Sequence, residues 1–315
     1  MEGIEHKMIS VNGINMHVAE MGQGPIVLLI HGFPELWYSW RHQIIYLAAH
    51  GYRAVAPDLR GYGDTTGAPL DDPTKFTTLH VVGDMVALID ALGADMVFVV
   101  GHDWGALIAW RLCLFRPDKV IALVNLSVHF NPRNPKRKIL ENVRAAYGDD
   151  HYICRFQEPG EMEAVFASYG TKKAIEKFLT YRDRAPFYFP TDKPFGALYD
   201  TPVIYPSWLS EEDVDYYTKR FEQTGFTGAL NYYRCVDLDW ELEAPWTDAK
   251  ASVPVKYIVG ELDLVYNEEY VKGGGFKKNV PQLEEVVVIE GAAHFITQEI
   301  PDKINKHIYD FLQKF

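Results

Sequence analysis

The chain of 315 residues is 48% hydrophobic and carries a formal net charge of −12. Its length and apolar content suffice for a large core, and we expect one large domain with an inserted part. The negative charge, with a sequence pI near 5.4, argues against nucleic acid and anionic membrane surfaces as partners, because both bind mainly through lysine and arginine.

The first 126 residues alternate between strand and helix patterns. The chain opens with two strands joined by Asn12-Gly13, a dipeptide that tolerates positive φ and suits a tight hairpin. Apolar residues at helical spacing predict helices over 37–50, 79–89 and 104–116. The segments with strand patterns in this part are 8–11, 14–20, 25–30, 53–56, 96–100 and 120–126. This alternation predicts a mostly parallel sheet covered by helices.

After about Phe130 the pattern changes to polar helical segments that are interrupted by prolines and rich in aromatic residues. We interpret this segment as an inserted lid and expect ordinary packing for most of its rings. Strand patterns resume at 255–259 and 286–289, and a final helix presents an apolar face through Ile304 and Ile308. The predicted organisation is therefore a core in two parts, with a helical lid between them. The expected boundaries are 1–129 and 247–315 for the core and 130–246 for the lid.

The cysteines and the first residues bear on the location of the protein. Cys113, Cys154 and Cys235 are too few and too scattered for a disulfide scaffold or a zinc site, and they predict buried thiols in a reducing compartment. The segment 1–7 lacks a basic stretch followed by an apolar run. No stretch approaches the roughly 18 uninterrupted apolar residues of a membrane span. We therefore expect a cytoplasmic protein.

The most informative motif is the turn Gly101-His-Asp-Trp-Gly105, in which Asp103 holds the position of a nucleophile. In such a turn from strand to helix the central side chain is strained and exposed, and the glycines avoid a Cβ clash. A carboxylate there is suited to displace a good leaving group from an sp3 carbon and to leave an alkyl ester on the enzyme. The expected electrophile is a strained ring or a carbon halide. The alternative is an ordinary helix N-cap, for which Asp is favoured.

Two further candidates follow predicted strands downstream. Asp263 comes after 255–259, and His294 comes after 286–289. Ligand sites of open α/β sheets form at the carboxyl ends of strands, and the order nucleophile, acid, histidine is that of α/β-hydrolases. Taken singly, such an Asp is often a turn former and such a His a capping residue.

The turn His31-Gly-Phe-Pro-Glu35 is a candidate oxyanion hole. Its Phe33 backbone N–H can be aimed at a point that the N–H of Trp104 also reaches. With an aspartate nucleophile these donors are expected to stabilise the tetrahedral intermediate formed when water attacks the ester. The alternative is a simple turn that ends a strand.

Taken together, these motifs resemble one family. The residues that carry the resemblance are His31-Gly-Phe-Pro-Glu35, Asp58-Leu-Arg-Gly-Tyr-Gly-Asp64, Gly101-His-Asp-Trp-Gly105, Asp263, His294 and two lid tyrosines. Over essentially its full length the chain resembles the plant-type soluble epoxide hydrolases. The resemblance implies an α/β-hydrolase fold, with a mostly parallel eight-stranded sheet flanked by helices and a helical lid.

In this family two lid phenols activate the epoxide oxygen, and the matching positions are Tyr152 and Tyr233. Tyr232 is adjacent, but we prefer Tyr233 because it directly precedes Arg234, as the family pattern requires. The family mechanism implies that Asp103 attacks one ring carbon while the phenols bind the epoxide oxygen.

The second step of the family mechanism is hydrolysis of the ester. His294, oriented by Asp263, removes a proton from the attacking water, and a vicinal diol leaves. Glu35 is expected to help hold this water in a minor role, since a loop glutamate is more often solvated. The expected partners are a small apolar epoxide and water, and no metal or organic cofactor is required.

Two other functions stay open at this point. A haloalkane or haloacid dehalogenase shares the Asp nucleophile, the His and a tryptophan such as Trp104 that can hold halide. Halide leaves without a proton, so that chemistry gives no reason for two phenols facing Asp103. A non-catalytic receptor of the same fold is the other alternative. An intact set of Asp103, Asp263 and His294 argues against it.

Overall fold

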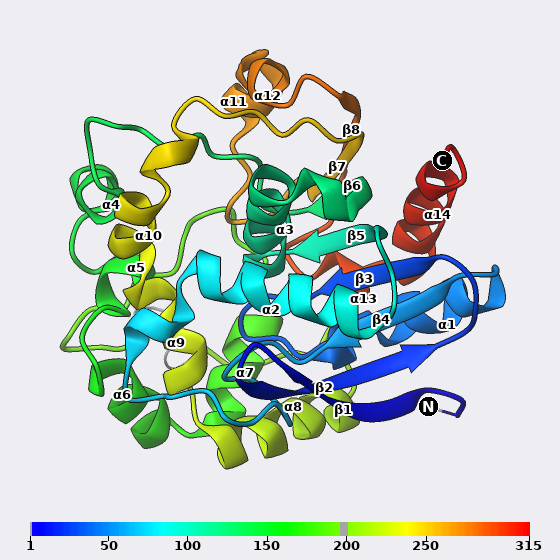
Figure 1. The fold of residues 1–315 in the computed structure, drawn as a ribbon. Coiled ribbons are helices and arrows are strands. Elements are labelled where there is room, and N and C mark those ends of the chain that lie inside the picture. The colour runs from blue at the N-terminus through cyan, green and yellow to red at the C-terminus, as the bar shows by residue number, and fades with distance from the viewer. Residues whose placement is uncertain (1, 196–200) are drawn as a thin grey trace.

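The computed structural model describes residues 2–195 and 201–315, which form a sheet with helices on both faces (Figure 1). Its eight strands lie in the order β1-β2-β4-β3-β5-β6-β7-β8. They are β1 (Glu5–Val11), β2 (Ile14–Met21), β3 (Ile26–Ile30), β4 (Arg53–Pro57), β5 (Val97–His102), β6 (Val120–Leu126), β7 (Val255–Gly260) and β8 (Leu283–Ile289). The pairs β1–β2 and β2–β4 are antiparallel, and all other pairs are parallel. The mostly parallel eight-stranded sheet is confirmed.

Burial follows the position of each strand in the sheet. The central strands β3 and β5 are buried along their whole length, as expected for strands with helices on both faces. The edge strand β1 is mostly exposed. Asn12 and Gly13 have φ of 46° and 82° at the turn between β1 and β2, which confirms the predicted hairpin.

Four long helices cover the sheet. They are α1 (Arg41–Ala49), α2 (Thr78–Ala91), α3 (Trp104–Phe115) and α14 (Pro301–Leu312). α1 packs against α14, and α2 packs against α3 (Figure 1). The helix predicted over 37–50 begins as a 3-10 turn, η1 (Trp37–Trp40), and continues as α1. Near the carboxyl end of the chain are α11 (Glu268–Lys272), α12 (Gly275–Asn279) and α13 (Ile296–Glu299).

The segment between β6 and β7 is helical and is coloured green to yellow in Figure 1. Its helices are α4 (Ile139–Tyr147), α5 (Tyr152–Arg155), α6 (Glu161–Tyr169), α7 (Thr171–Leu179), α8 (Glu211–Thr224), α9 (Thr227–Arg234) and α10 (Val236–Leu242). Many of its aromatic rings pack on one another inside the segment, as Phe156, Phe166 and Phe178 do. Among the described residues no helix is both long and apolar enough to cross a membrane.

Buried polar contacts hold this helical segment to the rest of the molecule. Asp213 of α8 accepts a hydrogen bond from the Tyr38 hydroxyl at 2.9 Å and lies 3.0 Å from an Arg41 nitrogen. Arg111 of α3 pairs with Glu243, just beyond α10, at 2.6 Å. Removing one partner would leave the other buried without its hydration. Such a substitution lowers the free energy of unfolding far more than the loss of an exposed ion pair does.

A second contact between the helical segment and the rest of the molecule involves a carboxyl group, that of Asp239, with an unusual pKa. Asp239 of α10 accepts hydrogen bonds from the backbone N–H and the hydroxyl of Thr78, at 2.8 and 2.9 Å. Glu243 also contacts the Thr78 hydroxyl, at 3.1 Å. Burial, with the nearby charge of Glu243, raises the pKa of Asp239 to about 7. The folded protein therefore holds a proton on Asp239 at pH values where the unfolded chain has lost it.

We expect Asp239→Asn to remove a pH-dependent part of the stability. Since the pKa of Asp239 is raised in the folded state, its contribution is fullest near pH 4 and is lost as the pH rises to about 7. An asparagine carries no charge at any pH and can still accept from Thr78. The difference in free energy of unfolding between the variant and wild type should shift in favour of the variant by on the order of 2 to 4 kcal/mol from pH 4 to pH 8. Urea unfolding at both pH values measures this. Identical pH dependence of the two proteins would contradict it.

Candidate active site

The turn after β5 has the geometry of a nucleophile elbow. Asp103 has φ of 53° and ψ of −121° and stands between the end of β5 and the start of α3. A Cβ atom on Gly105 would lie 1.9 Å from the carbonyl oxygen of Ile30, so only glycine fits there. The Asp103 side chain makes no capping hydrogen bond to α3. Asp103 therefore occupies the N-cap position of α3, but its carboxylate contacts Phe33 and His294 and does not cap the helix.

The Asp103 carboxylate is held by groups from two other loops. Its Oδ1 accepts a hydrogen bond from the Phe33 backbone N–H at 2.7 Å, and its Oδ2 lies 3.5 Å from Nε2 of His294. The described hydrogen bonds include none from the Trp104 backbone N–H to this carboxylate. Burial alone would raise the pKa of Asp103, but the bond and charge of His294, with the Phe33 N–H, lower it overall. The carboxylate is thus ionised at neutral pH, with one oxygen held by the Phe33 N–H and the other beside His294.

His294 lies between two carboxylates. Its Nδ1 is 2.9 Å from Oδ1 of Asp263, on the side opposite Asp103. The Ser127 hydroxyl also lies 3.2 Å from the same nitrogen. Burial alone would lower the pKa of His294, but the charges of Asp263 and Asp103 raise it well above its ordinary value. Asp263 itself is buried, yet the His294 charge holds its pKa below the ordinary value. Asp103, His294 and Asp263 therefore lie in a row, and the two carboxylates favour the protonated form of the imidazole between them.

Glu35 is fully buried, which corrects the expectation of a solvated loop glutamate. Its Oε2 accepts from the Gly32 backbone N–H at 3.1 Å and lies 2.7 Å from Nδ1 of His102. The other His102 nitrogen is 2.8 Å from the backbone carbonyl oxygen of His294. The pair connects the loop of Phe33 to the loop of His294.

The two lid tyrosines face this carboxylate from different helices. Tyr152 begins α5 and Tyr233 lies in α9, and their ring centroids are 5.9 Å apart at an interplanar angle of 80°. Both line cavities that Asp103 also lines. Burial and the Asp103 charge raise the pKa of each phenol, so both are neutral donors at neutral pH. The Tyr232 hydroxyl instead donates to the Arg60 backbone carbonyl at 2.9 Å.

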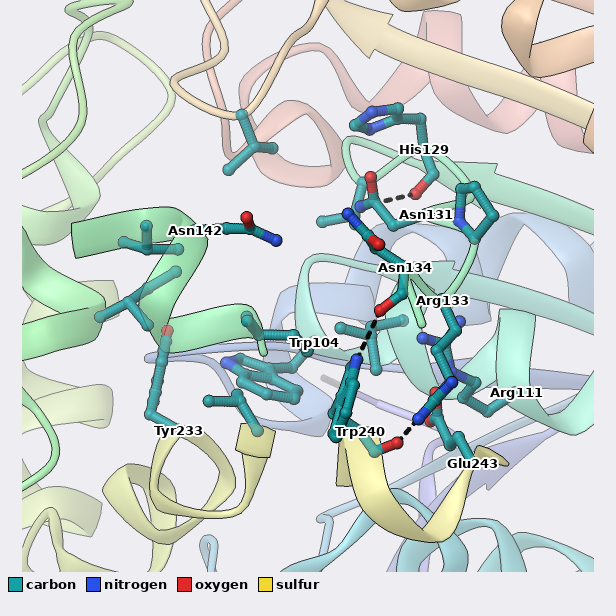
Figure 2. A pocket seen from close by; sticks show the side chains of 18 of the residues that line it. Trp104, Arg111, His129, Asn131, Arg133, Asn134, Asn142, Tyr233, Trp240 and Glu243 are labelled. Carbon is teal, nitrogen blue, oxygen red and sulfur yellow. Dashed lines mark hydrogen bonds and ion pairs between the residues drawn. The ribbon is translucent and has the colours of Figure 1, made fainter. Parts of the chain in front are cut away.

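Two cavities meet at Asp103, Tyr152 and Tyr233, which line both. The larger has a volume of about 400 Å³ and runs from Asp103 and Tyr233 to the loop after β6 and to α4 and α10 (Figure 2). The smaller, about 30 Å³, lies beside His294 and is walled mainly by aromatic rings such as Phe33 and Phe156. A cavity of the smaller size holds little more than one or two water molecules.

Sequence reasoning missed His102 and Ser127. His102 is the last residue of β5, and Ser127 directly follows β6. Both stand at carboxyl ends of parallel strands, the position used to find Asp263 and His294, so the same rule could have found them.

Within the described residues, the cluster with metal-ligand geometry is His17, Asp58 and Asp64, outside this site. Its atoms already have partners. His17 Nδ1 contacts Asp58 at 2.8 Å, and Asp58 also accepts from the Trp37 backbone N–H at 3.0 Å. We assign this cluster to the packing between β2 and β4.

Comparison with known proteins gives consistent results. A family model described as alpha/beta hydrolase fold matches residues 25–153. The chain is 59% identical to epoxide hydrolase 2 of Siraitia grosvenorii over 319 residues, covering all of both chains. The structure of potato epoxide hydrolase I superposes with a TM-score of 0.96 at 67% identity, covering 99% of this chain and all of that one. The epoxide hydrolase structure from Vigna radiata gives a TM-score of 0.96 at 56% identity, covering all of this chain and 99% of that one.

Proposed function

Since the chain belongs to the plant epoxide hydrolases of the α/β-hydrolase fold, and hydrolyses epoxides to vicinal diols, we propose that Asp103, His294, Asp263, Tyr152 and Tyr233 carry out its reaction. The observation that carries this assignment is the position of Asp103. Its carboxylate accepts from the Phe33 N–H, approaches His294 and lines the same cavities as the two phenols. Dehalogenation and a receptor role are not favoured by the relatives.

In the proposed first step, an Asp103 oxygen attacks one carbon of the epoxide and the bond from that carbon to the ring oxygen breaks. The hydroxyls of Tyr152 and Tyr233 donate to the ring oxygen as negative charge develops on it. One phenol then gives its proton to the alkoxide. Burial suits the phenols to this role because their raised pKa keeps them protonated until the alkoxide, a stronger base, appears.

The proposed second step begins when Asp103 has become an ester. The ester carries no charge, so one of the two charges that raise the pKa of His294 is gone. The imidazole can then act as a base and take a proton from water, with Asp263 stabilising the imidazolium. The water attacks the ester carbonyl carbon, and the bond from that carbon to the alkyl oxygen then breaks. The diol leaves with the original Asp103 oxygen, which takes the remaining proton of the attacking water. The proton on His294 returns to the phenolate left by the first step, so that both groups are restored.

We propose that Phe33 and Trp104 supply backbone N–H groups to the tetrahedral intermediate of this step. The 2.7 Å contact from Phe33 to Asp103 supports the first donor. The place of Trp104 at the amino-terminal end of α3 supports the second. We propose that Glu35 acts mainly through His102, as a positioning residue for the loops that carry Phe33 and His294. In this assignment His294 alone activates the water.

We also propose the domain boundaries 1–129, 130–246 and 247–315, because β6 ends at Leu126 and β7 begins at Val255. The proposed partners are a small apolar epoxide and water, without a metal or organic cofactor. We propose a cytoplasmic location, which the buried free thiols of the three cysteines support.

An oxygen-18 experiment tests the nucleophile. In a single turnover in labelled water with enzyme in excess, we expect a mostly unlabelled diol and the label in the peptide that contains Asp103. The reason is that water attacks the ester carbonyl and its oxygen stays in the protein. Mass spectrometry of the diol and of the digested protein measures both. Label found chiefly in the diol of the first turnover would mean that water attacks the epoxide directly.

A further inference from the structure

Ser127 directly follows β6, the strand that lies between β5 and β7 in the sheet (Figure 1). β5 ends at the turn of Asp103, and Asp263 lies in the loop after β7. The Ser127 side chain is fully buried, and its backbone N–H donates to the Ile258 carbonyl of β7 at 2.9 Å. The serine thus stands at the same edge of the sheet as the reacting groups, although neither reaction step assigns a role to its hydroxyl.

The backbone of Ser127 has a conformation that favours glycine. Its φ is 73°, in the left-handed region, where the Cβ atom of other residues is crowded. The Tyr257 hydroxyl donates to the Ser127 carbonyl at 2.6 Å and holds this peptide in place. A glycine would adopt the same backbone with less strain. The serine costs stability at this position, which points to a use for its hydroxyl.

The hydroxyl contacts the pair that forms the base of the second step. Ser127 Oγ lies 3.2 Å from Nδ1 of His294, and the same nitrogen is 2.9 Å from Oδ1 of Asp263. Because Nδ1 faces a carboxylate, we assign a proton to this nitrogen, so the hydroxyl accepts from it. The proton of the hydroxyl itself is then available to another acceptor.

Asp263 offers that acceptor. Its Oδ1 faces His294 and accepts from the Val265 backbone N–H at 3.0 Å, whereas its buried Oδ2 has no hydrogen-bond partner in the described part of the chain. Burial alone would raise the pKa of Asp263, but the charge and hydrogen bond of His294, the Val265 N–H and the Ser127 hydroxyl lower it. The hydroxyl is therefore close enough to interact with both members of the pair.

We propose that Ser127 is a positioning residue for the second step, in which its hydroxyl accepts from His294 and donates to Asp263. The proposal rests on the assigned active site, because it requires His294 to be the base that takes a proton from water. Positive charge then develops on the imidazole, and the hydroxyl oxygen beside Nδ1 stabilises it. The hydroxyl proton stabilises the negative charge of Asp263 in the same way. Both interactions favour the ion pair that forms as water attacks the ester.

Pre-steady-state kinetics separate the two steps. Ser127→Ala should slow hydrolysis of the ester by about 10-fold to 100-fold and change the rate of ester formation by less than about threefold. The ester should therefore accumulate in the variant during turnover. Rapid quenching followed by intact-protein mass spectrometry measures both rates.

The pH profile of ester hydrolysis gives a second readout. Among the described residues, the titratable groups that face His294 are His102 and Asp103 at the end of β5, and Asp263 after β7. Ser127→Ala retains all three. Hydrolysis requires a neutral imidazole, so its rate falls as the pH drops through the pKa of His294 in the ester. Loss of an acceptor at Nδ1 disfavours the imidazolium, and this acid limb should move to lower pH by up to about one unit.

Two further variants make the test specific. Ser127→Gly removes the same hydroxyl and relieves the backbone, so it should resist urea better than Ser127→Ala and yet hydrolyse the ester equally slowly. It also keeps the question answerable if the alanine variant folds poorly. In an Asp263→Asn background, Ser127→Ala should slow hydrolysis by less than about threefold, because the ion pair that the hydroxyl stabilises is already lost.

The outcomes separate this proposal from the assigned site. Ester hydrolysis at the wild-type rate in Ser127→Ala and Ser127→Gly would overturn the proposal. Equal slowing of both steps would also overturn it, because Ser127 would then only support the fold, as would an undiminished effect of Ser127→Ala in the Asp263→Asn background. If neither wild type nor His294→Gln forms an ester with epoxide, the active site on which the proposal rests is wrong instead.

Discussion

Replacing His294 with glutamine should leave the substrate attached to Asp103. The first step needs only the carboxylate and the two phenols, so epoxide opening continues. The second step loses the group that takes a proton from water, and glutamine cannot replace it near neutral pH. Steady-state turnover should fall by about 1,000-fold or more, while one equivalent of ester accumulates per active site.

Intact-protein mass spectrometry after mixing with epoxide measures this accumulation. The expected mass increase is that of the epoxide, and digestion should place it on the peptide that contains Asp103. The double variant Asp103→Asn, His294→Gln is the matched control and should show no adduct. If His294→Gln opens epoxide without forming any adduct, the covalent mechanism is wrong.

Removing both lid phenols should nearly abolish epoxide opening. Tyr152→Phe or Tyr233→Phe alone should slow the first step by about 100-fold or more, since the remaining hydroxyl can still donate to the ring oxygen. The double variant leaves the developing alkoxide without a donor inside a buried cavity, where an unpaired charge is most costly. Its rate should fall by at least about 10,000-fold. Single-turnover rates of ester formation measure the first step directly.

Tyr232→Phe is the matched control for these variants, because Tyr232 is adjacent to Tyr233 in α9. Its hydroxyl bonds the Arg60 backbone carbonyl, away from the cavities. Losing this buried hydrogen bond should cost about 1 kcal/mol in free energy of unfolding and leave the rate of epoxide opening within about twofold of wild type. Wild-type turnover by the Tyr152→Phe, Tyr233→Phe variant would show that the phenols have no catalytic role.

Much of this protein could be predicted from local patterns. The hairpin at Asn12-Gly13, the buried strands and the parallel alternation follow from backbone preference and apolar periodicity, which neighbouring residues decide. The Gly101-x-Asp103-x-Gly105 pattern is also local and could be recognised in the sequence, although the close approach that requires glycine at position 105 comes from Ile30 on β3. The order of residues in this turn was therefore enough to name the candidate nucleophile.

Contacts between distant segments depended on the tertiary structure. Phe33 and Asp103 are 70 positions apart, and His102 meets the His294 loop across 192 positions. The sequence resemblance named Glu35, but only the fold showed that it is buried against His102 rather than solvated. Periodicity predicts which face of an element is buried, whereas the partner on that face depends on how the whole sheet and lid dock.

The lid shows this limit most clearly. Tyr232 and Tyr233 are adjacent and chemically identical, and only the packing of α9 decides that one hydroxyl is bound to the core while the other side chain lines the cavities. Sequence by itself determines residue type and local backbone, while separation, burial and charge pairing between remote side chains are properties of the packed chain.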